Sequence, residues 1–114
     1  MDVLIKTINN SSFVGKLLSE DLNILVIVNN NVTHYMIYKN NIIYVQKFNK
    51  DNVNSIKEVD LLENLKDKTI TINLINGDEL TGTLKNYYKD KLIVQSDNIT
   101  YEIYKNAIVA VIFR

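Results

Sequence analysis

The chain has 114 residues, 46% of them hydrophobic, and its 13 basic and 13 acidic residues give a formal net charge of zero and a pI near 6.6. This balance argues against a protein that coats nucleic acid by bulk positive charge, although it leaves room for a local basic feature. The lack of cysteine excludes disulfides and thiolate metal sites, and no apolar run approaches the roughly 18 residues that a membrane span needs. Asp2 stands where a signal peptide would be basic, so we expect a cytoplasmic globular protein.

The N-terminal half contains five short runs rich in β-branched and aromatic residues. They predict strands, separated by turns rich in Asn and Asp, at 3–8, 12–19, 23–28, 32–38 and 42–48. Residues 49–57 are mostly polar and break this periodicity, which predicts a linker. Residues 58–66 then carry Val59, Leu62 and Leu65 on one face, as expected of a short helix.

A second set of five strand-like runs lies between Ile70 and Phe113. Turn residues separate these runs at Asn76-Gly77, Lys89-Asp90, Ser96-Asp97-Asn98 and Lys105-Asn106. Because no room remains for a crossover helix, the five strands must form an antiparallel meander. A sheet this small with one apolar face is expected to curl into a barrel, and Gly82 in its second strand is the expected bend point.

The two halves match as an internal repeat. When Gly15 is placed on Gly82, at an offset of 82 − 15 = 67, the strands of the first half fall on those of the second as far as Leu25–Ile27 over Leu92–Val94. One position is lost after that, and at an offset of 66 the triplet Tyr38-Lys39-Asn40 falls on Tyr104-Lys105-Asn106. The sequence therefore predicts two copies of one barrel.

The segment from Asp60 to Phe113 resembles the bacterial Hfq branch of the Sm-like proteins. The resemblance rests on the order and spacing of Asn76-Gly77, Leu80, Gly82, Leu92-Ile93-Val94 and Ile103-Tyr104-Lys105-Asn106-Ala107-Ile108. It implies a mainly β fold of two tandem, strongly bent, five-stranded antiparallel Sm-like (SH3-like) barrels. The implied domains are a first barrel at 1–48 without a preceding helix, a linker at 49–57, and a short α-helix with the second barrel at 58–114.

The resemblance also implies self-association. Sm-like barrels leave the edges of their fourth and fifth strands unpaired, and a neighbour normally covers such edges. Here the fourth strands, 32–38 and 99–104, are rich in β-branched and aromatic residues and contain no proline. Since single Hfq barrels form hexamers, three two-barrel chains are expected to close one ring as a homotrimer with pseudo-sixfold symmetry.

Catalysis has little support in the sequence. His34 is the one histidine and lies on a predicted strand without a partner residue, so we interpret it as a sheet-surface side chain. Asp78 and Glu79 are adjacent on a hairpin, where successive side chains point to opposite faces, so they do not converge on a metal or a substrate. We expect no enzyme activity, no catalytic residue, no metal site and no cofactor.

The two Tyr-Lys-Asn turns are the candidate binding site. In Hfq the corresponding turn faces the central pore, where a tyrosine-lysine-histidine triplet binds uridine-rich RNA, so the resemblance assigns RNA contact to Tyr38, Lys39, Asn40, Tyr104, Lys105 and Asn106. Asn40 and Asn106 replace the histidine and keep a donor and an acceptor for a base edge. Asn23 and Asp90 stand where Hfq has its uracil-stacking aromatic residue. Six lysines from three chains would meet at one opening.

Two functions are consistent with these features. The first is a ring that binds single-stranded RNA at its pore, with uridine-rich RNA as a candidate ligand, and that acts in post-transcriptional regulation or as an RNA chaperone. The second is a ring-forming scaffold or protein-interaction module that kept the fold and lost RNA binding. The duplicated Tyr-Lys turns favour the first, whereas the neutral pI and the missing stacking residues favour the second.

Overall fold

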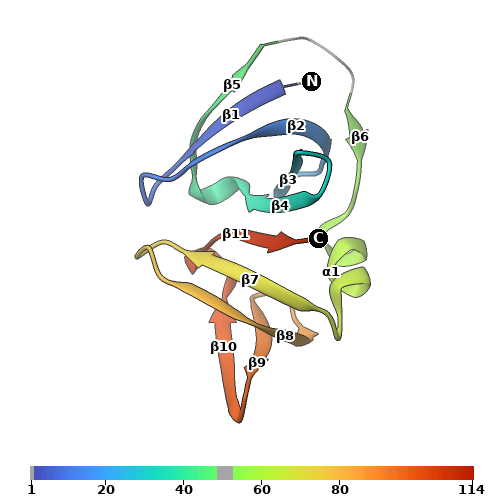
Figure 1. Ribbon diagram of the computed structural model, residues 1–114, viewed down its shortest axis with the longest axis vertical. Coiled ribbons are helices and arrows are strands. Elements are labelled where there is room, and N and C mark those ends of the chain that lie inside the picture. The colour runs from blue at the N-terminus through green and yellow to red at the C-terminus, as the bar shows by residue number, and fades with distance from the viewer. Residues whose placement is uncertain (1, 49–52) are drawn as a thin grey trace.

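Two five-stranded units and one helix make up the fold, which a computed structural model describes for residues 2–48 and 53–114 (Figure 1). The first unit contains β1 (Asp2–Thr7), β2 (Ser12–Glu20), β3 (Ile24–Asn29), β4 (Thr33–Tyr38) and β5 (Ile42–Lys47). After it come β6 (Asn54–Ser55) and the helix α1 (Glu58–Leu65). The second unit contains β7 (Thr69–Leu74), β8 (Glu79–Tyr87), β9 (Lys91–Ser96), β10 (Ile99–Tyr104) and β11 (Ile108–Phe113).

The strands of the two units form one continuous antiparallel sheet. Its order is β10-β9-β8-β7-β11-β4-β3-β2-β1-β5. Read from the β5 end, each unit contributes its fifth, first, second, third and fourth strands in turn. The units meet where β4, the fourth strand of the first unit, pairs with β11, the fifth strand of the second. Figure 1 shows these two strands side by side between the units. The predicted mainly β, antiparallel fold with one short helix is confirmed.

The two units share irregularities as well as strand order. The register of β2 with β3 shifts between Leu17 and Ser19, and that of β8 with β9 shifts between Leu84 and Asn86, which are the equivalent positions of the repeat. A Cβ atom on Gly15 would lie 2.6 Å from Val28 O, and one on Gly82 would lie 2.6 Å from Gln95 O. Glycine is needed at both positions because the neighbouring strand backbone approaches too closely for any side chain.

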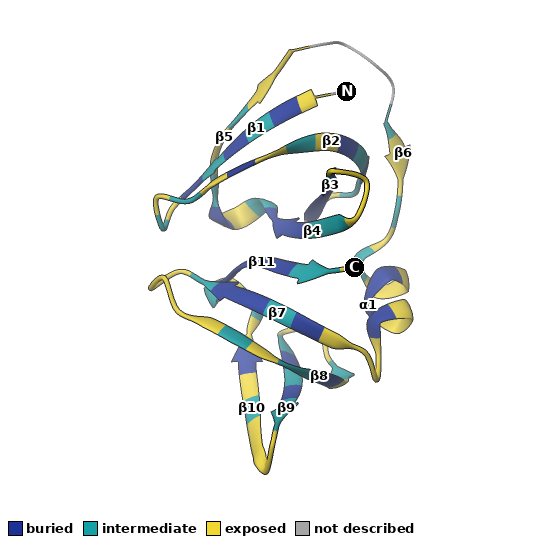
Figure 2. Ribbon diagram, viewed as in Figure 1, coloured by how far each residue is buried: buried dark blue, intermediate teal, exposed yellow. Residues whose placement is uncertain are grey.

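The hydrophobic core crosses the junction between the units. One cluster joins Ile24, Val26, Met36 and Tyr38 of the first unit to helix α1 and to the interior of the second unit. The other adds Val109 and Ala110 of β11 to the interior of the first unit. Figure 2 shows the resulting band of buried residues along β4 and β11, whereas exposed residues predominate on β5 and β10.

One expectation needs correction. The predicted apolar face of the helix included Val59, but Val59 is 51% exposed, and the buried positions are Leu61, Leu62 and Leu65. The helix lies at the edge of the core, so its first turn lines a cleft instead of the interior. Part of the predicted linker, residues 49–52, lies outside the described residues. In the described part of this segment, β6 pairs in parallel with β2, and the flanking Val53 and Ile56 pack on the two core clusters.

His34 lies at the junction between the units. Its ring stacks on Phe113 with centroids 5.1 Å apart and planes inclined by 17°, and its Nδ1 lies 3.1 Å from Val32 O. These contacts agree with the interpretation of His34 as a sheet-surface residue.

Candidate functional site

The two Tyr-Lys-Asn triplets adopt the same backbone structure. Each tyrosine ends a fourth strand and precedes a 3-10 turn, Lys39–Asn41 in the first unit and Lys105–Ala107 in the second. The amide N–H of Lys39 donates to Asn23 O at 2.8 Å, and that of Lys105 donates to Asp90 O at 2.9 Å. Asn23 and Asp90 are themselves equivalent positions of the repeat. The two turns that the predicted repeat pairs therefore share one backbone structure.

The side chains of the two turns are not equivalent. A cleft of about 740 Å³ lies at the junction of the units and contains Tyr38, Lys39, Asn40 and Lys105 in its lining. The remaining lining comes from Leu22 and Asn23, the first turns of α1, and Tyr87, Tyr88 and Lys89. Tyr104 and Asn106 are not part of this lining. Four of the six predicted site residues thus share one cleft and two do not.

The lining of this cleft contains more lysines than carboxylates. It contains three lysines, Lys39, Lys89 and Lys105, and one carboxylate, Glu58. Two aromatic residues, Tyr87 and Tyr88, line the same cleft as these lysines. Lysines interleaved with tyrosines in a groove are the combination that binds phosphates and stacks bases in single-stranded nucleic acids.

Both predicted pore lysines already have carboxylate partners. Lys39 Nζ lies 3.0 Å from Glu20 Oε2, and both side chains are 35% exposed. Lys105 Nζ lies 3.2 Å from Glu58 Oε2, and these side chains are only 15% and 14% exposed. Each of these two lysines is therefore neutralised by a carboxylate of its own chain. The six lysines expected to meet in a ring of three chains would carry these partners with them.

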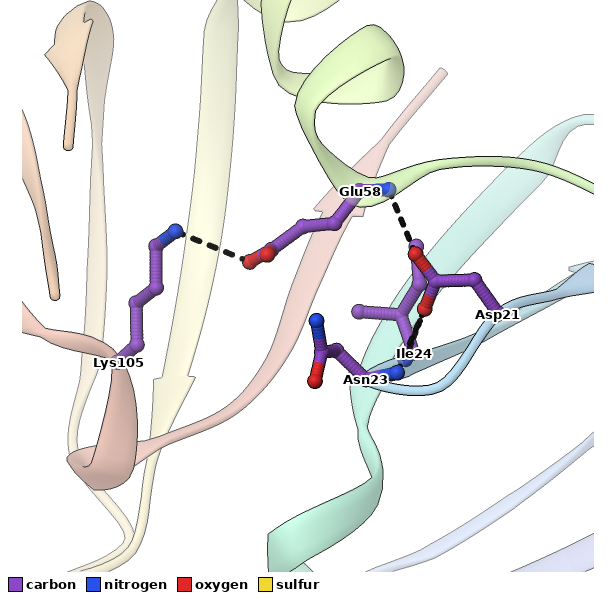
Figure 3. A network of polar contacts seen from close by, with 5 residues as sticks. All are labelled: Asp21, Asn23, Ile24, Glu58 and Lys105. Carbon is purple, nitrogen blue, oxygen red and sulfur yellow. Dashed lines mark hydrogen bonds and ion pairs between the residues drawn. The ribbon is translucent and has the colours of Figure 1, made fainter. Parts of the chain in front are cut away.

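A polar network connects the Lys105–Glu58 pair to the first unit (Figure 3). Asp21, in the loop after β2, accepts hydrogen bonds through Oδ1 from the amides of Asn23 at 2.6 Å and Ile24 at 2.8 Å. Its other oxygen, Oδ2, accepts from the amide of Glu58 at 2.8 Å. Lys57 at the N-cap position provides no side-chain hydrogen bond to the helix, so Asp21 caps α1 from the other unit.

Tyr38 contributes a buried hydroxyl beside this network. Its side chain is 4% exposed, and within the described part of the chain the hydroxyl has no partner in good hydrogen-bonding geometry. Burial, and then the nearby carboxylates of Glu58 and Asp21, raise the pKa of Tyr38 above the ordinary value of 10.0. The hydroxyl therefore stays protonated in its buried position beside Glu58.

A second group of aromatic and cationic side chains lies next to the cleft and was missed by sequence reasoning. Lys91 Nζ lies 5.7 Å from the ring centroid of Tyr88 and 5.9 Å from that of Tyr104, and it pairs with Glu102 at 2.6 Å. The hydrogen bond to Glu102 raises the pKa of Lys91. Lys91 is the direct cross-strand neighbour of Tyr104, so correct pairing of β9 with β10 would have revealed the contact.

Tyr87 and Tyr88 differ in exposure. Tyr87 packs partly against the core, and its hydroxyl donates to Glu63 on α1. Tyr88 is 49% exposed, and its hydroxyl accepts a hydrogen bond from Asn86 Nδ2 at 3.1 Å. Of the two rings, Tyr88 is the more accessible to a base.

The described ranges contain neither a metal cluster nor a membrane-spanning helix. In residues 2–48 and 53–114 no three His, Cys, Asp or Glu side chains come together as a metal site. The helix in those ranges falls short of the length and apolarity required to cross a bilayer.

Comparisons with known proteins found similarity among solved structures. No protein-family profile matches the chain. No curated protein sequence matches it either. Among solved structures, the chain is similar to a crystal structure described as that of the pleiotropic translational regulator Hfq, with 28% sequence identity and a TM-score of 0.46. The match covers 47% of this chain and 93% of the Hfq chain.

Proposed function

We propose that the chain is a tandem Sm-like protein that binds single-stranded RNA on a ring assembled from several copies. The observation that carries the RNA-binding part is the cleft in which Lys39 and Lys105, from two equivalent turns, lie beside Tyr88 and Lys89. Among the described residues this arrangement does not resemble a catalytic constellation, so the proposed role is binding. A cytoplasmic location and a part in post-transcriptional regulation belong to the same proposal.

The proposed ring follows from the way in which the units are joined. Pairing of β4 with β11 uses one fourth strand and one fifth strand, and leaves β10 and β5 at the two ends of the described sheet. A fourth strand at one end and a fifth strand at the other allow chains to join head to tail. Three chains would provide the six barrels expected from the sequence resemblance, with a first unit at 1–48, a linker at 49–57 and a second unit at 58–114.

RNA binding would require the lysines to exchange partners. The Lys39–Glu20 pair is open to solvent, and exposed ion pairs contribute only about 0–1 kcal/mol, so a phosphate can displace Glu20 at small cost. The Lys105–Glu58 pair is more covered and is tied to Asp21 through the helix, so its exchange costs more. Asn40 is exposed beside Lys39 and offers amide hydrogen bonds to a base edge, while Tyr88 offers a ring face.

The alternative is a ring-forming scaffold that does not bind RNA. The specific observation in its favour is that both pore lysines are already neutralised, Lys39 by Glu20 and Lys105 by Glu58. On this alternative the two ion pairs are structural, and the cleft is a product of the way the units pack.

Fluorescence anisotropy with uridine-rich and adenine-rich oligonucleotides at two salt concentrations separates the two functions. The proposal predicts binding that weakens with salt, and a loss of at least tenfold in affinity when Lys39→Ala and Lys105→Ala are combined. The matched control combines Lys16→Ala and Lys85→Ala, exposed strand lysines, one from each unit, that are not in the cleft lining. Absence of RNA binding by the wild type, or equal binding by both double variants, would favour the scaffold.

A further inference from the structure

The tip of the β7–β8 hairpin carries the only Asn-Gly pair of the sequence, Asn76-Gly77. The turn is closed by hydrogen bonds from Gly77 N–H to Leu74 O and from Leu74 N–H to Asp78 O, both at 2.9 Å. Asn76 and Gly77 are exposed, and Gly77 has a φ of +89°. Apart from its chain neighbours, no atom of the described residues lies within 4 Å of the place that a Cβ of Gly77 would take. The peptide bond after Asn76 is therefore open on its glycine side.

Asp78 holds the side-chain amide of Asn76 at both ends. The N–H of Asp78 donates to Asn76 Oδ1 at 3.0 Å, and Asn76 Nδ2 donates to Asp78 Oδ2 at 3.0 Å. A backbone donor on Oδ1 stabilises the negative charge that forms on this oxygen when a nucleophile attacks the amide carbon Cγ. The backbone nitrogen of Gly77 is such a nucleophile, because its attack on Cγ closes a succinimide ring. The Gly77 N–H must first leave Leu74 O, a local opening that an exposed loop tip allows.

We propose that Asn76 deamidates spontaneously in the folded chain, whereas the equivalent Asn9 is protected. The Gly77 nitrogen gives its proton to solvent and bonds to Cγ of Asn76, the Cγ–Nδ2 bond breaks, and the amide nitrogen leaves as ammonia with a proton from solvent. Water then opens the succinimide. Cleavage of its N–Cγ bond gives aspartate, and cleavage of the bond between the nitrogen and the backbone carbonyl carbon gives isoaspartate. The reaction consumes only water and is independent of RNA binding and of ring assembly.

The first unit contains the same turn without the glycine. By the repeat offset of 67, Asn9 and Asn10 correspond to Asn76 and Gly77. Asn10 N–H donates to Thr7 O at 3.0 Å and closes the turn as Gly77 N–H does, and Asn10 also has a positive φ of 67°. A side chain on the residue after the asparagine hinders the attack, because it limits the backbone rotation that brings the nitrogen to Cγ.

Hydrogen bonds also hold the amide of Asn9 in place. Its Nδ2 donates to Asn73 Oδ1 at 2.8 Å and to Leu74 O at 3.0 Å, across the junction between the units. Its Oδ1 accepts from Thr7 Oγ1 at 2.7 Å and from the amide of Ser11 at 3.1 Å. Turning Cγ of Asn9 toward the next backbone nitrogen would break these contacts. Among the described residues, the side chain of Asn76 is hydrogen-bonded only within its own turn.

Deamidation would weaken this hairpin tip and its contact with the second Tyr-Lys-Asn turn. The product replaces the Nδ2 donor by a carboxylate beside the Asp78 carboxylate, so attraction becomes repulsion. Next to this site, Ile75 N–H donates to Ala107 O at 2.9 Å, at the end of the 3-10 turn Lys105–Ala107. The reaction thus changes the second unit selectively, and it shifts the formal net charge from 0 to 0 − 1 = −1.

Peptide mass spectrometry of the folded chain after incubation at pH 7 and pH 9 tests the proposal. Trypsin releases residues 69–85, with Asn73 and Asn76, and residues 7–16, with Asn9 and Asn10, so fragment ions assign each conversion. Asn76 should convert at least about tenfold faster than the other three asparagines, a difference of about 1.4 kcal/mol in activation free energy. Conversion should rise with pH, because the attacking nitrogen must lose its proton, and a protein isoaspartyl methyltransferase should label the product. An Asn76 that stays intact in the folded chain while the free peptide 69–85 converts would overturn the proposal.

Two single exchanges separate the effect of the glycine from the effect of the turn. Gly77→Asn gives the second unit the Asn-Asn turn with which the first unit already folds, and it should slow conversion at Asn76 at least about tenfold. Asn10→Gly gives the first unit an Asn-Gly turn, but Asn9 should still convert more slowly than Asn76, because its amide is held across the junction. An unchanged rate at Asn76 in the first variant would refute the role of the glycine, and equal rates at Asn9 and Asn76 in the second would refute the protection of Asn9.

Asn76→Asp reproduces one product and tests its effect on the fold. Hydrogen exchange at the Ile75 amide should accelerate several-fold relative to the wild type. The Ile8 amide, which donates to Asn41 O at 3.0 Å in the first unit, should exchange at the wild-type rate. Unchanged exchange at Ile75 would show that the added charge does not loosen the tip, and it would exclude the selective weakening of the second unit.

Discussion

Lys105 Nζ lies 3.2 Å from Glu58 Oε2, which joins the second Tyr-Lys-Asn turn to the first residue of helix α1. The amide of Glu58 also donates a hydrogen bond to Asp21 of the first unit. The ion pair therefore lies where the second Tyr-Lys-Asn turn, helix α1 and the first unit meet. A lysine held in this way has a lower affinity for phosphate than a free lysine, because the carboxylate competes for it.

Glu58→Gln is therefore expected to strengthen RNA binding. The substitution keeps the amide bond to Asp21 and removes the negative charge that neutralises Lys105. Affinity should rise several-fold, and the slope of log affinity against log salt should steepen by about 0.7, the value for one phosphate contact on a single strand. Glu63→Gln is the matched control, since it removes the same charge from α1 at a residue that is hydrogen-bonded to Tyr87. Equal affinities for the two variants would show that the pair does not restrain Lys105.

Asn41→Ala is expected to destabilise the junction between the units. The buried amide of Asn41 satisfies the carbonyls of Asn106 and Ile108, and its loss leaves both without this donor. We expect a cost of about 1–3 kcal/mol in the free energy of unfolding, measured by urea denaturation. The neighbouring exposed residue provides the control, because Asn40→Ala should change stability by less than about 0.5 kcal/mol. Similar stabilities for the two variants would refute the anchoring role.

Alanine at Gly82 or Gly15 is expected to cost about 1–3 kcal/mol in folding stability, because the added Cβ would lie 2.6 Å from a strand carbonyl. Gly77→Ala meets no atom within 4 Å and should cost about 1–2 kcal/mol for a different reason, its φ of +89°. Thermal denaturation of the three variants measures these costs. A Gly82→Ala chain as stable as the wild type would contradict the close approach of β8 and β9.

Tyr38 should make folding stability depend on pH in the alkaline range. The pKa of Tyr38 in the folded chain is raised above the ordinary value of 10.0. Below about pH 10 the hydroxyl is protonated in the folded and the unfolded chain, so the contribution of Tyr38 to folding stability is fully present. As the pH rises further the unfolded chain ionises first, and this contribution is lost. Tyr38→Phe should reduce this decline and be neutral or slightly stabilising at pH 7, because it removes a buried hydroxyl without a well-placed partner. Urea midpoints at pH 8 and 10.5 measure the effect, with the exposed Tyr88→Phe as control. An alkaline decline of the same size in wild type and Tyr38→Phe would be evidence against this role.

The strands and the helix were predictable because their signals are local. Alternation of apolar and polar residues placed the strands of both units and the helix close to their observed bounds, and the repeat identified Lys39 and Lys105 as equivalent turn residues. The environment of those lysines was not predictable. Glu58 and Lys105 are far apart in the sequence, and their contact depends on where α1 is held by Asp21. The exposure of Val59 was not predictable for the same reason, because it also depends on the position of α1. Periodicity defines the apolar face of a helix, but it does not show which turns of that face lie beyond the core.

Native mass spectrometry of the wild-type chain, alone and with an equimolar uridine-rich oligonucleotide, decides most simply whether the protein is an RNA-binding ring. A three-chain ring should give a species with three times the 13.2 kDa mass of one chain, and that species should retain the oligonucleotide. A mass of one or two chains, or a three-chain species that never carries RNA, would contradict the proposed function.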